Sequence, residues 1–193
     1  MAQQHMKSGG LTPDGKSVLP AGVRIRRLEV HQDQRGLLSE IFRQDWDTGV
    51  APVQWNTVTS DAGVLRGVHV HLRHADYLVV LQGQMSLGLK DLRDDSPTAG
   101  PGLVVELDGN DLHSIFIPPG VAHGFYFHSR CLHVYAVTEY WDPDDELGCH
   151  WDDPELQIPW HIAEPVLSDR DSSLPSLKCL MHELGRRRQT GLP

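Results

Sequence analysis

Residues 63–83 read GVLRGVHVHLRHADYLVVLQG, and residues 118–123 read PPGVAH. His69 and His71 are two positions apart in the first segment, and alternate residues of a strand lie on one face, so their imidazoles point the same way. In the second segment, His123 follows a proline–glycine turn. Any one of these histidines alone is best explained as lining a barrel mouth and bonding to its neighbours. Their combined spacing makes them candidates for one site.

Short β-rich segments separated by turn residues extend on both sides of these motifs, from Val23 to Trp141. This pattern is typical of an all-β sandwich or barrel. The run Tyr77–Gln82 is almost continuously apolar, as expected for a strand covered on both faces. The predicted strands are Val53–Ser60, Val64–His71, Tyr77–Gln82, Met85–Leu92, Leu103–Leu107, Ser114–Ile117, Gly124–Phe127 and Leu132–Tyr140.

The two ends of the chain differ from this β-rich middle. Residues 1–20 are polar and rich in glycine and proline, which predicts a flexible arm. After Trp141, an acidic stretch punctuated by prolines predicts an extended covering loop. Residues 174–188 have apolar side chains at helical spacing, which predicts a C-terminal helix that ends in a solvated basic run. Residues 21–193 are therefore expected to form a single domain.

Composition narrows the classes of function. A chain of 193 residues suits one domain, and its net charge of −9 disfavours nucleic-acid binding, which needs a basic face. The three cysteines form no CxxC pair, and the chain shows neither a signal-peptide pattern nor an apolar run of about 20 residues. We therefore expect a cytoplasmic protein with no membrane span and no nucleic-acid partner.

The two histidine segments resemble the two cupin motifs, G(x5)HxH(x4)E(x6)G and PxG(x2)H. Gly63, His69, His71 and Gly83 fit the first motif, and Asp76 stands where the glutamate would be. The resemblance implies an all-β, cupin-type jelly-roll barrel with a short C-terminal helix, in which the histidines share one pocket.

Within the cupins, the chain resembles the dTDP-4-dehydrorhamnose 3,5-epimerase family from about Arg24 to Leu177. The matching segments are DQRGLLSEIF, QWNTVTSDAGVLRGVH, DLRDDSPTAG, IPPGVAHGF, VYAVTEYWDPDDELGCHWDDPELQIPW and LSDRDSSLP. The resemblance implies a homodimeric enzyme without a cofactor that inverts C3, C5 or both of a 4-keto sugar linked to a nucleoside diphosphate.

The resemblance also implies three catalytic residues. His69 is expected to be the base, because an imidazole can remove the weakly acidic proton beside a ketone. Asp171 is expected to hold that imidazole in the correct tautomer. Tyr135 is expected to return a proton on the opposite face of the ring, which inverts the centre. The alternatives are a buried tyrosine with a bonded hydroxyl and an aspartate that caps the last helix.

Further positions match the family's substrate contacts. Arginine suits a diphosphate because its guanidinium donates two parallel charged hydrogen bonds, and an indole can stack on a base. The predicted substrate-binding residues are Arg35, Glu40, Gln54, Asn56, Arg66, His123, Trp141 and Glu146.

The pocket departs from the family pattern at two positions. Where the family usually has a glutamine and a lysine, this chain has His71 and Asp76. The lysine is expected to stabilise the oxyanion that develops at the 4-keto oxygen, and a carboxylate would oppose that charge. Either His123 or a protonated His71 paired with Asp76 could supply the missing donor.

The alternative function is a metal-dependent cupin enzyme, an isomerase or a dioxygenase. Its ligands would be His69, His71, Asp76 and His123, a set that suits several transition metals. A metal on His69 would remove that imidazole as a base, so the two mechanisms are expected to exclude each other. A third possibility is a sugar-nucleotide binder without catalytic activity.

Overall fold

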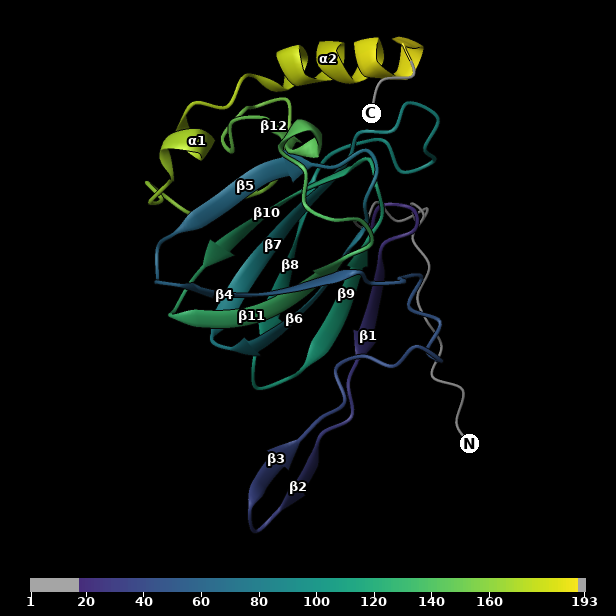
Figure 1. Ribbon diagram of the computed structural model, residues 1–193. Coiled ribbons are helices and arrows are strands. Elements are labelled where there is room, and N and C mark those ends of the chain that lie inside the picture. The colour runs from purple at the N-terminus through teal and green to yellow at the C-terminus, as the bar shows by residue number, and fades with distance from the viewer. Residues whose placement is uncertain (1–17, 191–193) are drawn as a thin grey trace.

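Two five-stranded antiparallel sheets face each other in the computed structural model, which describes residues 18–190 (Figure 1). The first sheet has the order β1 (Arg24–Arg27), β9 (His113–Ile117), β6 (Asp76–Gln82), β11 (Cys131–Val137) and β4 (Gln54–Ser60). The second has the order β12 (Leu147–Gly148), β5 (Leu65–Val70), β10 (Val121–Phe127), β7 (Gln84–Asp91) and β8 (Leu103–Asp108). This arrangement is the predicted all-β jelly roll.

The eight predicted strands correspond to β4 through β11, with ends displaced by a few residues. The sequence analysis missed the short strands β1 and β12 and a hairpin formed by β2 (His31–Asp33) and β3 (Gly36–Leu38). It also missed the 3-10 turn η1 (Pro143–Asp145) and the one-turn helix α1 (Asp169–Ser172). Elements this short carry too few residues to display a periodic pattern.

The main core lies between the two sheets, where Leu78, Leu87, Ile115 and Phe127 are at most 1% exposed. Burying each such side chain contributes about 1.5–3 kcal/mol. Strand β6 is covered on both faces, as predicted. Its residues Leu78 and Val80 face this core, while Tyr77 and Val79 pack in a second cluster with the segment that follows β1.

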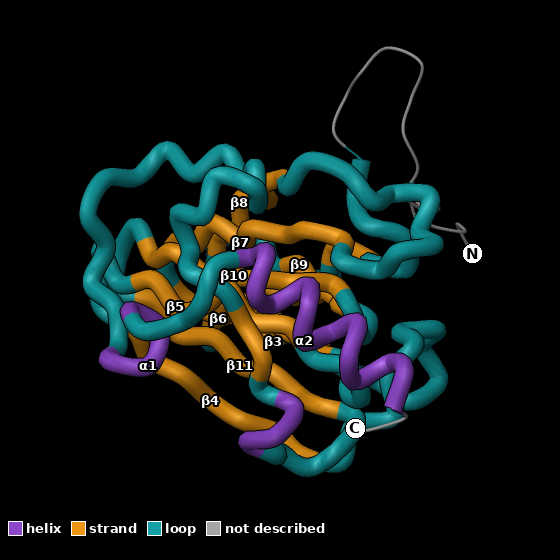
Figure 2. Tube along the Cα trace, turned by 90° about the horizontal axis from the view of Figure 1, so that it is seen from above, coloured by secondary structure: helices purple, strands orange, loops and turns teal. Residues whose placement is uncertain are grey.

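Helix α2 (Leu177–Thr190) covers the outer face of the second sheet, and Figure 2 looks down on it as it crosses above those strands. Leu177, Leu180 and Leu184 pack against Val68 and Val70 of β5. The predicted helix is confirmed, although it begins three residues later than predicted, at Leu177.

The basic run that ends α2 is more than the solvated face that was predicted. Arg186 bonds to Glu183 on the same helix, while Arg188 pairs with Asp94 and donates to the Leu92 carbonyl oxygen. These contacts fix the end of α2 against the loop after β7.

Most of the predicted arm, residues 1–17, lies outside the described residues, whereas Leu19 packs against the main core. No helix among residues 18–190 is long and apolar enough to span a bilayer.

Candidate active site

A cavity of about 270 Å³ opens between the sheets, where β4, β6 and β11 face β5 and β10. The segment after Trp141 contributes Glu146, which lies between η1 and β12, and Ser168, Arg170 and Asp171 at α1 to the wall of this cavity. Nine of the predicted catalytic and substrate-binding residues line this cavity, and so do the predicted metal ligands His71 and Asp76. The nine are Gln54, Asn56, Arg66, His69, His123, Tyr135, Trp141, Glu146 and Asp171.

The imidazole of His69, on β5, is hydrogen-bonded to the carboxylate of Asp171. Nε2 lies 2.7 Å from Oδ1, and the side chains are 16% and 6% exposed. Burial raises the pKa of Asp171, but the hydrogen bond and the charge of His69 outweigh burial and bring the pKa below its usual value. With Nε2–H donated to the carboxylate, Nδ1 of His69 has no hydrogen-bond partner among the described residues. It is therefore the nitrogen that can accept a proton.

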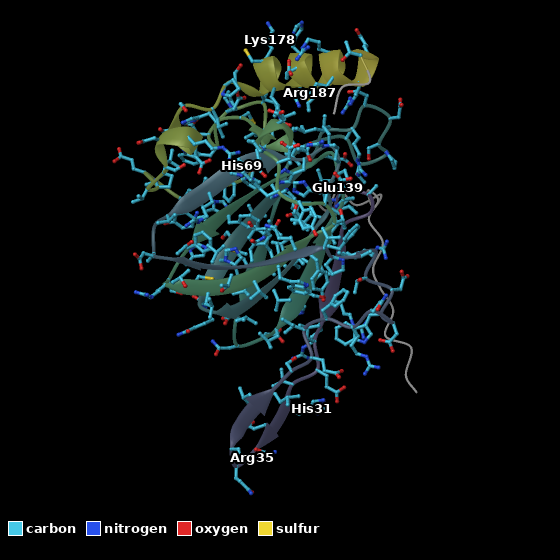
Figure 3. The ribbon with its side chains drawn as sticks, in the orientation of Figure 1. His31, Arg35, His69, Glu139, Lys178 and Arg187 are labelled. Carbon is cyan, nitrogen blue, oxygen red and sulfur yellow. The ribbon has the colours of Figure 1, made fainter. Side chains whose placement is uncertain are left out.

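Asp171 is placed by α1 and does not cap the last helix. The N-cap of α1 is Ser168, whose Oγ accepts a hydrogen bond from the backbone N–H of Asp171 at 3.0 Å. The capping alternative is therefore wrong, because this turn directs the carboxylate at His69 instead. Figure 3 labels His69, which lies on the strand beneath α1 and the covering segment.

Gly67 sets the position of His69 along β5. Its φ is +121°, and a Cβ at this position would lie 2.7 Å from the Cα of Gly124 on β10. Only glycine allows the two backbones to approach so closely. Because His69 pairs directly with His123 across these strands, a side chain at residue 67 would displace both imidazoles.

Tyr135 lies on β11 in the opposite sheet, so it lines the same cavity as His69 but from the facing layer. Burial raises the pKa of its phenol, and the nearby carboxylates of Asp76 and Glu146 raise it further. The hydroxyl therefore stays protonated at neutral pH. A base on one wall and a proton donor on the other is the arrangement that an inversion at carbon needs.

Polar side chains near the rim are linked to one another. Gln54 donates to Asn56 at 3.0 Å and accepts from the backbone N–H of Trp141 at 3.2 Å. Arg66 donates to Ser60 at 3.0 Å. The side chain of Trp141 is 56% exposed, so its ring is free to stack on a ligand.

Two of the polar cavity residues that the sequence analysis missed are Arg170 and His133. Arg170, which precedes Asp171, donates to Glu146 Oε2 at 3.0 Å and adds a cation to the rim. His133 lies two residues before Tyr135 on β11, and its ring stacks on Phe127 with 5.7 Å between centroids. The alternation of strand residues could have placed His133 on the cavity side with Tyr135.

Arg35 and Glu40 do not reach the cavity of their own chain. Arg35 lies on the β2–β3 hairpin, which projects away from the sheets, and Figure 3 places it far from His69. It pairs with Asp33 at 2.5 Å, while Glu40 pairs with Arg43 at 3.5 Å. The expectation that both residues line this pocket is therefore not met within one chain.

The predicted set of four metal ligands is not assembled as a unit. His71, Asp76 and His123 come together, but the Nε2 of His69 is directed at Asp171 instead. Burial lowers the pKa values of His71 and His123 to about 3, and burial raises that of Asp76 to about 7. A protonated His71 is therefore excluded as the donor that replaces the family's lysine.

An all-β jelly roll with an imidazole–carboxylate pair facing a phenol across a cavity defines a class: cupin-like isomerases that move protons at carbon. Residues 19–179 match the family model described as dTDP-4-dehydrorhamnose 3,5-epimerase. The chain belongs to this family, which confirms the resemblance found in the sequence.

Relatives and solved structures agree with this placement. The dTDP-4-dehydrorhamnose 3,5-epimerase of Pseudomonas aeruginosa is 35% identical over 74% of this chain and 83% of its own. The Legionella pneumophila epimerase, solved with dTDP-4-keto-L-rhamnose, has a TM-score of 0.79 and 31% identity, and covers 93% of this chain and 97% of its own. A 3'-monoepimerase from Streptomyces bikiniensis, solved with dTDP-quinovose, has a TM-score of 0.78 and 28% identity, with coverages of 86% and 88%.

Proposed function

We propose that this protein epimerises a dTDP-4-keto-6-deoxyhexose at C3, C5 or both. The observation that carries the proposal is the buried hydrogen bond between His69 and Asp171 on one wall of a cavity whose facing wall holds Tyr135. Membership of an isomerase family supports the same reaction class.

In the proposed mechanism, His69 Nδ1 removes the proton from a carbon beside the ketone. The C–H electron pair becomes the C=C bond of an enolate, and the carbonyl π electrons move to oxygen. Tyr135 then delivers its hydroxyl proton to the same carbon from the other face, the ketone re-forms, and a phenolate remains. Exchange with solvent restores the neutral imidazole and the phenol, so the net change is inversion of that centre.

Asp171 contributes to this cycle through His69. Its ionised carboxylate holds the imidazole with Nε2–H directed away from the substrate and stabilises the imidazolium after proton transfer. It is therefore a positioning residue in the proposed mechanism.

The rim of the cavity supports a nucleoside diphosphate as the activating group of the substrate. Arg66 and Arg170 are cations that line it, and Trp141 presents an exposed ring at its edge. Guanidinium groups bind diphosphates through paired charged hydrogen bonds, and an indole can stack on the base. The chain's three free cysteines support a reducing cytoplasm as its location.

We also propose a homodimer. Leu37 and Leu38 on the projecting hairpin are 70% and 63% exposed, and a second copy would remove this apolar surface from water. In such a dimer, Arg35 and Glu40 would serve the partner's pocket, which accounts for their distance from their own.

The test is deuterium incorporation in heavy water. Incubation with dTDP-4-keto-6-deoxyglucose should place deuterium at C3, C5 or both, and NMR identifies which carbon has exchanged. His69→Asn should abolish exchange, whereas His161→Asn, at an exposed histidine away from the cavity, should not. The proposal fails if the folded wild-type protein binds nucleotide without exchange, or if exchange survives His69→Asn.

A further inference from the structure

Three buried side chains of the cavity take no part in the proton transfers proposed above. His71 follows the end of β5, Asp76 begins β6 and His123 lies on β10, so they come from both sheets. They are 6%, 7% and 4% exposed. One nitrogen or oxygen atom from each lies within 4.8 Å of the other two.

The Nδ1 atoms of His71 and His123 each lie within hydrogen-bonding distance of a backbone carbonyl oxygen. Nδ1 of His123 lies 3.1 Å from the carbonyl oxygen of Val121, and Nδ1 of His71 lies 3.2 Å from that of Asp145. Glu146 Oε1 lies 3.5 Å from the same His71 nitrogen. A ring nitrogen must carry the proton to bond such oxygens, and in a neutral imidazole the other nitrogen, Nε2, then holds a lone pair.

Both lone pairs approach one carboxylate oxygen. Asp76 Oδ2 lies 3.9 Å from Nε2 of His71 and 3.8 Å from Nε2 of His123, which is too far for a hydrogen bond. Within residues 18–190, no side chain or backbone N–H donates a hydrogen bond to this carboxylate. Three acceptors therefore converge in a buried place where none has a donor, and such groups are costly unless a cation compensates them.

We propose that His71 Nε2, Asp76 and His123 Nε2 bind a divalent first-row transition metal ion. Because the third separation is at most 4.8 Å, a point equidistant from the three atoms lies at most about 2.5 Å from each. This is close to the bond lengths of about 2.0–2.2 Å that nitrogen and oxygen ligands make to such ions. Backbone carbonyls that fix the ring tautomers are the usual outer partners of metal-binding histidines. The set of two imidazoles and a carboxylate suits zinc, cobalt, nickel, iron or manganese.

Three protein ligands leave a coordination position open toward the cavity that His69 and Tyr135 also line. This role rests on the proposed function: the ion would be a Lewis acid that polarises the ketone oxygen of the substrate. Without the ion, the negative charge of Asp76 would disfavour the negative charge that develops on that oxygen. His69 stays outside this ligand set because Asp171 holds its Nε2. The base and the metal are therefore compatible, contrary to the mutual exclusion expected from sequence.

The test measures metal binding without substrate. Protein stripped with a chelator is titrated with Co²⁺ and then Zn²⁺, followed by the visible absorption of bound cobalt, by calorimetry and by elemental analysis after gel filtration. The expected result is one equivalent per chain, with Zn²⁺ displacing Co²⁺ and raising the melting temperature. Asp76→Asn and His123→Gln should each weaken binding at least 30-fold.

Two control variants locate the ion. His161→Asn, at the surface, should bind metal like the wild type. His74→Gln tests the neighbouring cluster of His71, His74 and Asp145, and it should also leave binding unchanged. Circular dichroism establishes that each variant is folded, and either of the two ligand variants suffices if the other fails to fold.

The proposal is overturned if the folded, stripped protein binds less than one equivalent at millimolar Co²⁺ or Zn²⁺. It is also overturned if binding survives Asp76→Asn and His123→Gln, or is lost in His74→Gln alone. Because the assay contains no sugar nucleotide, a protein that exchanges no deuterium can still pass it, and an active epimerase can still fail it.

Discussion

Replacing Asp171 with asparagine tests the proposed proton transfer most directly. In the proposed reaction, His69 becomes positively charged 2.7 Å from Asp171 Oδ1, and both side chains are largely shielded from water. Unit charges about 4 Å apart at an effective dielectric constant of about 20 attract by about 4 kcal/mol. Since each 1.36 kcal/mol changes a rate tenfold, loss of this charge should lower kcat by about 10²–10³, the asparagine oxygen retaining part of the interaction.

The assay is the initial rate of deuterium exchange at saturating sugar nucleotide, measured by NMR. KM should change little, because Asp171 acts through His69 rather than on the substrate. Asp169→Asn is the matched control, since Asp169 is an exposed carboxylate on the same helical turn that does not line the cavity. A loss in Asp171→Asn of less than about tenfold, or an equal loss in the control, would refute the assigned role.

Three other predictions follow from individual side chains. Tyr135→Phe should retain exchange at the carbon facing His69 but reduce formation of the inverted product by about 10²–10⁴-fold, measured by NMR of the product; equal loss of both would contradict an acid role. Burial raises the pKa of Asp91, but bonds from Arg93 and two hydroxyls bring it down to about 2. Its stabilisation of about 2 kcal/mol is therefore complete above about pH 4 and lost as the pH falls toward 2, so Asp91→Asn should flatten acid unfolding curves there. Leu37→Asp with Leu38→Asp should convert the proposed dimer to monomer in analytical ultracentrifugation, and an unchanged mass would argue against this interface.

Much of this site could be predicted because its residues lie in local patterns. The spacing of His69, His71 and Asp76 is a property of one strand and the turn after it, and PPGVAH marks the start of the strand that carries His123. Strand alternation then decides which side chains share a face. Tyr135, in contrast, was predicted only through the family resemblance, because its segment contains no histidine motif or turn that would mark it as part of the site.

The rest depended on contacts between distant segments. Asp171 is separated by 102 positions from the imidazole to which it is hydrogen-bonded. No local pattern distinguishes a carboxylate that caps a helix from one that faces a distant imidazole. Arg35 was assigned to the pocket by its motif, but the hairpin that carries it extends away from its own barrel. Motifs preserve sequence order, and they do not state which pocket a projecting hairpin serves.

The amino-acid sequence alone indicated the class of fold and the strands that carry the predicted site residues, because hydrophobic alternation and turn residues act over a few positions. It indicated the family through the resemblance of its motifs. Only the tertiary structure showed that His69 is hydrogen-bonded to Asp171, whereas Asp76 lies with His71 and His123. Whether an imidazole is hydrogen-bonded to a carboxylate, as that of His69 is, or directs its lone pair toward Asp76, as those of His71 and His123 do, depends on which side chains the folded sheets bring within a few ångströms. Those distances are set by the packing of the whole barrel.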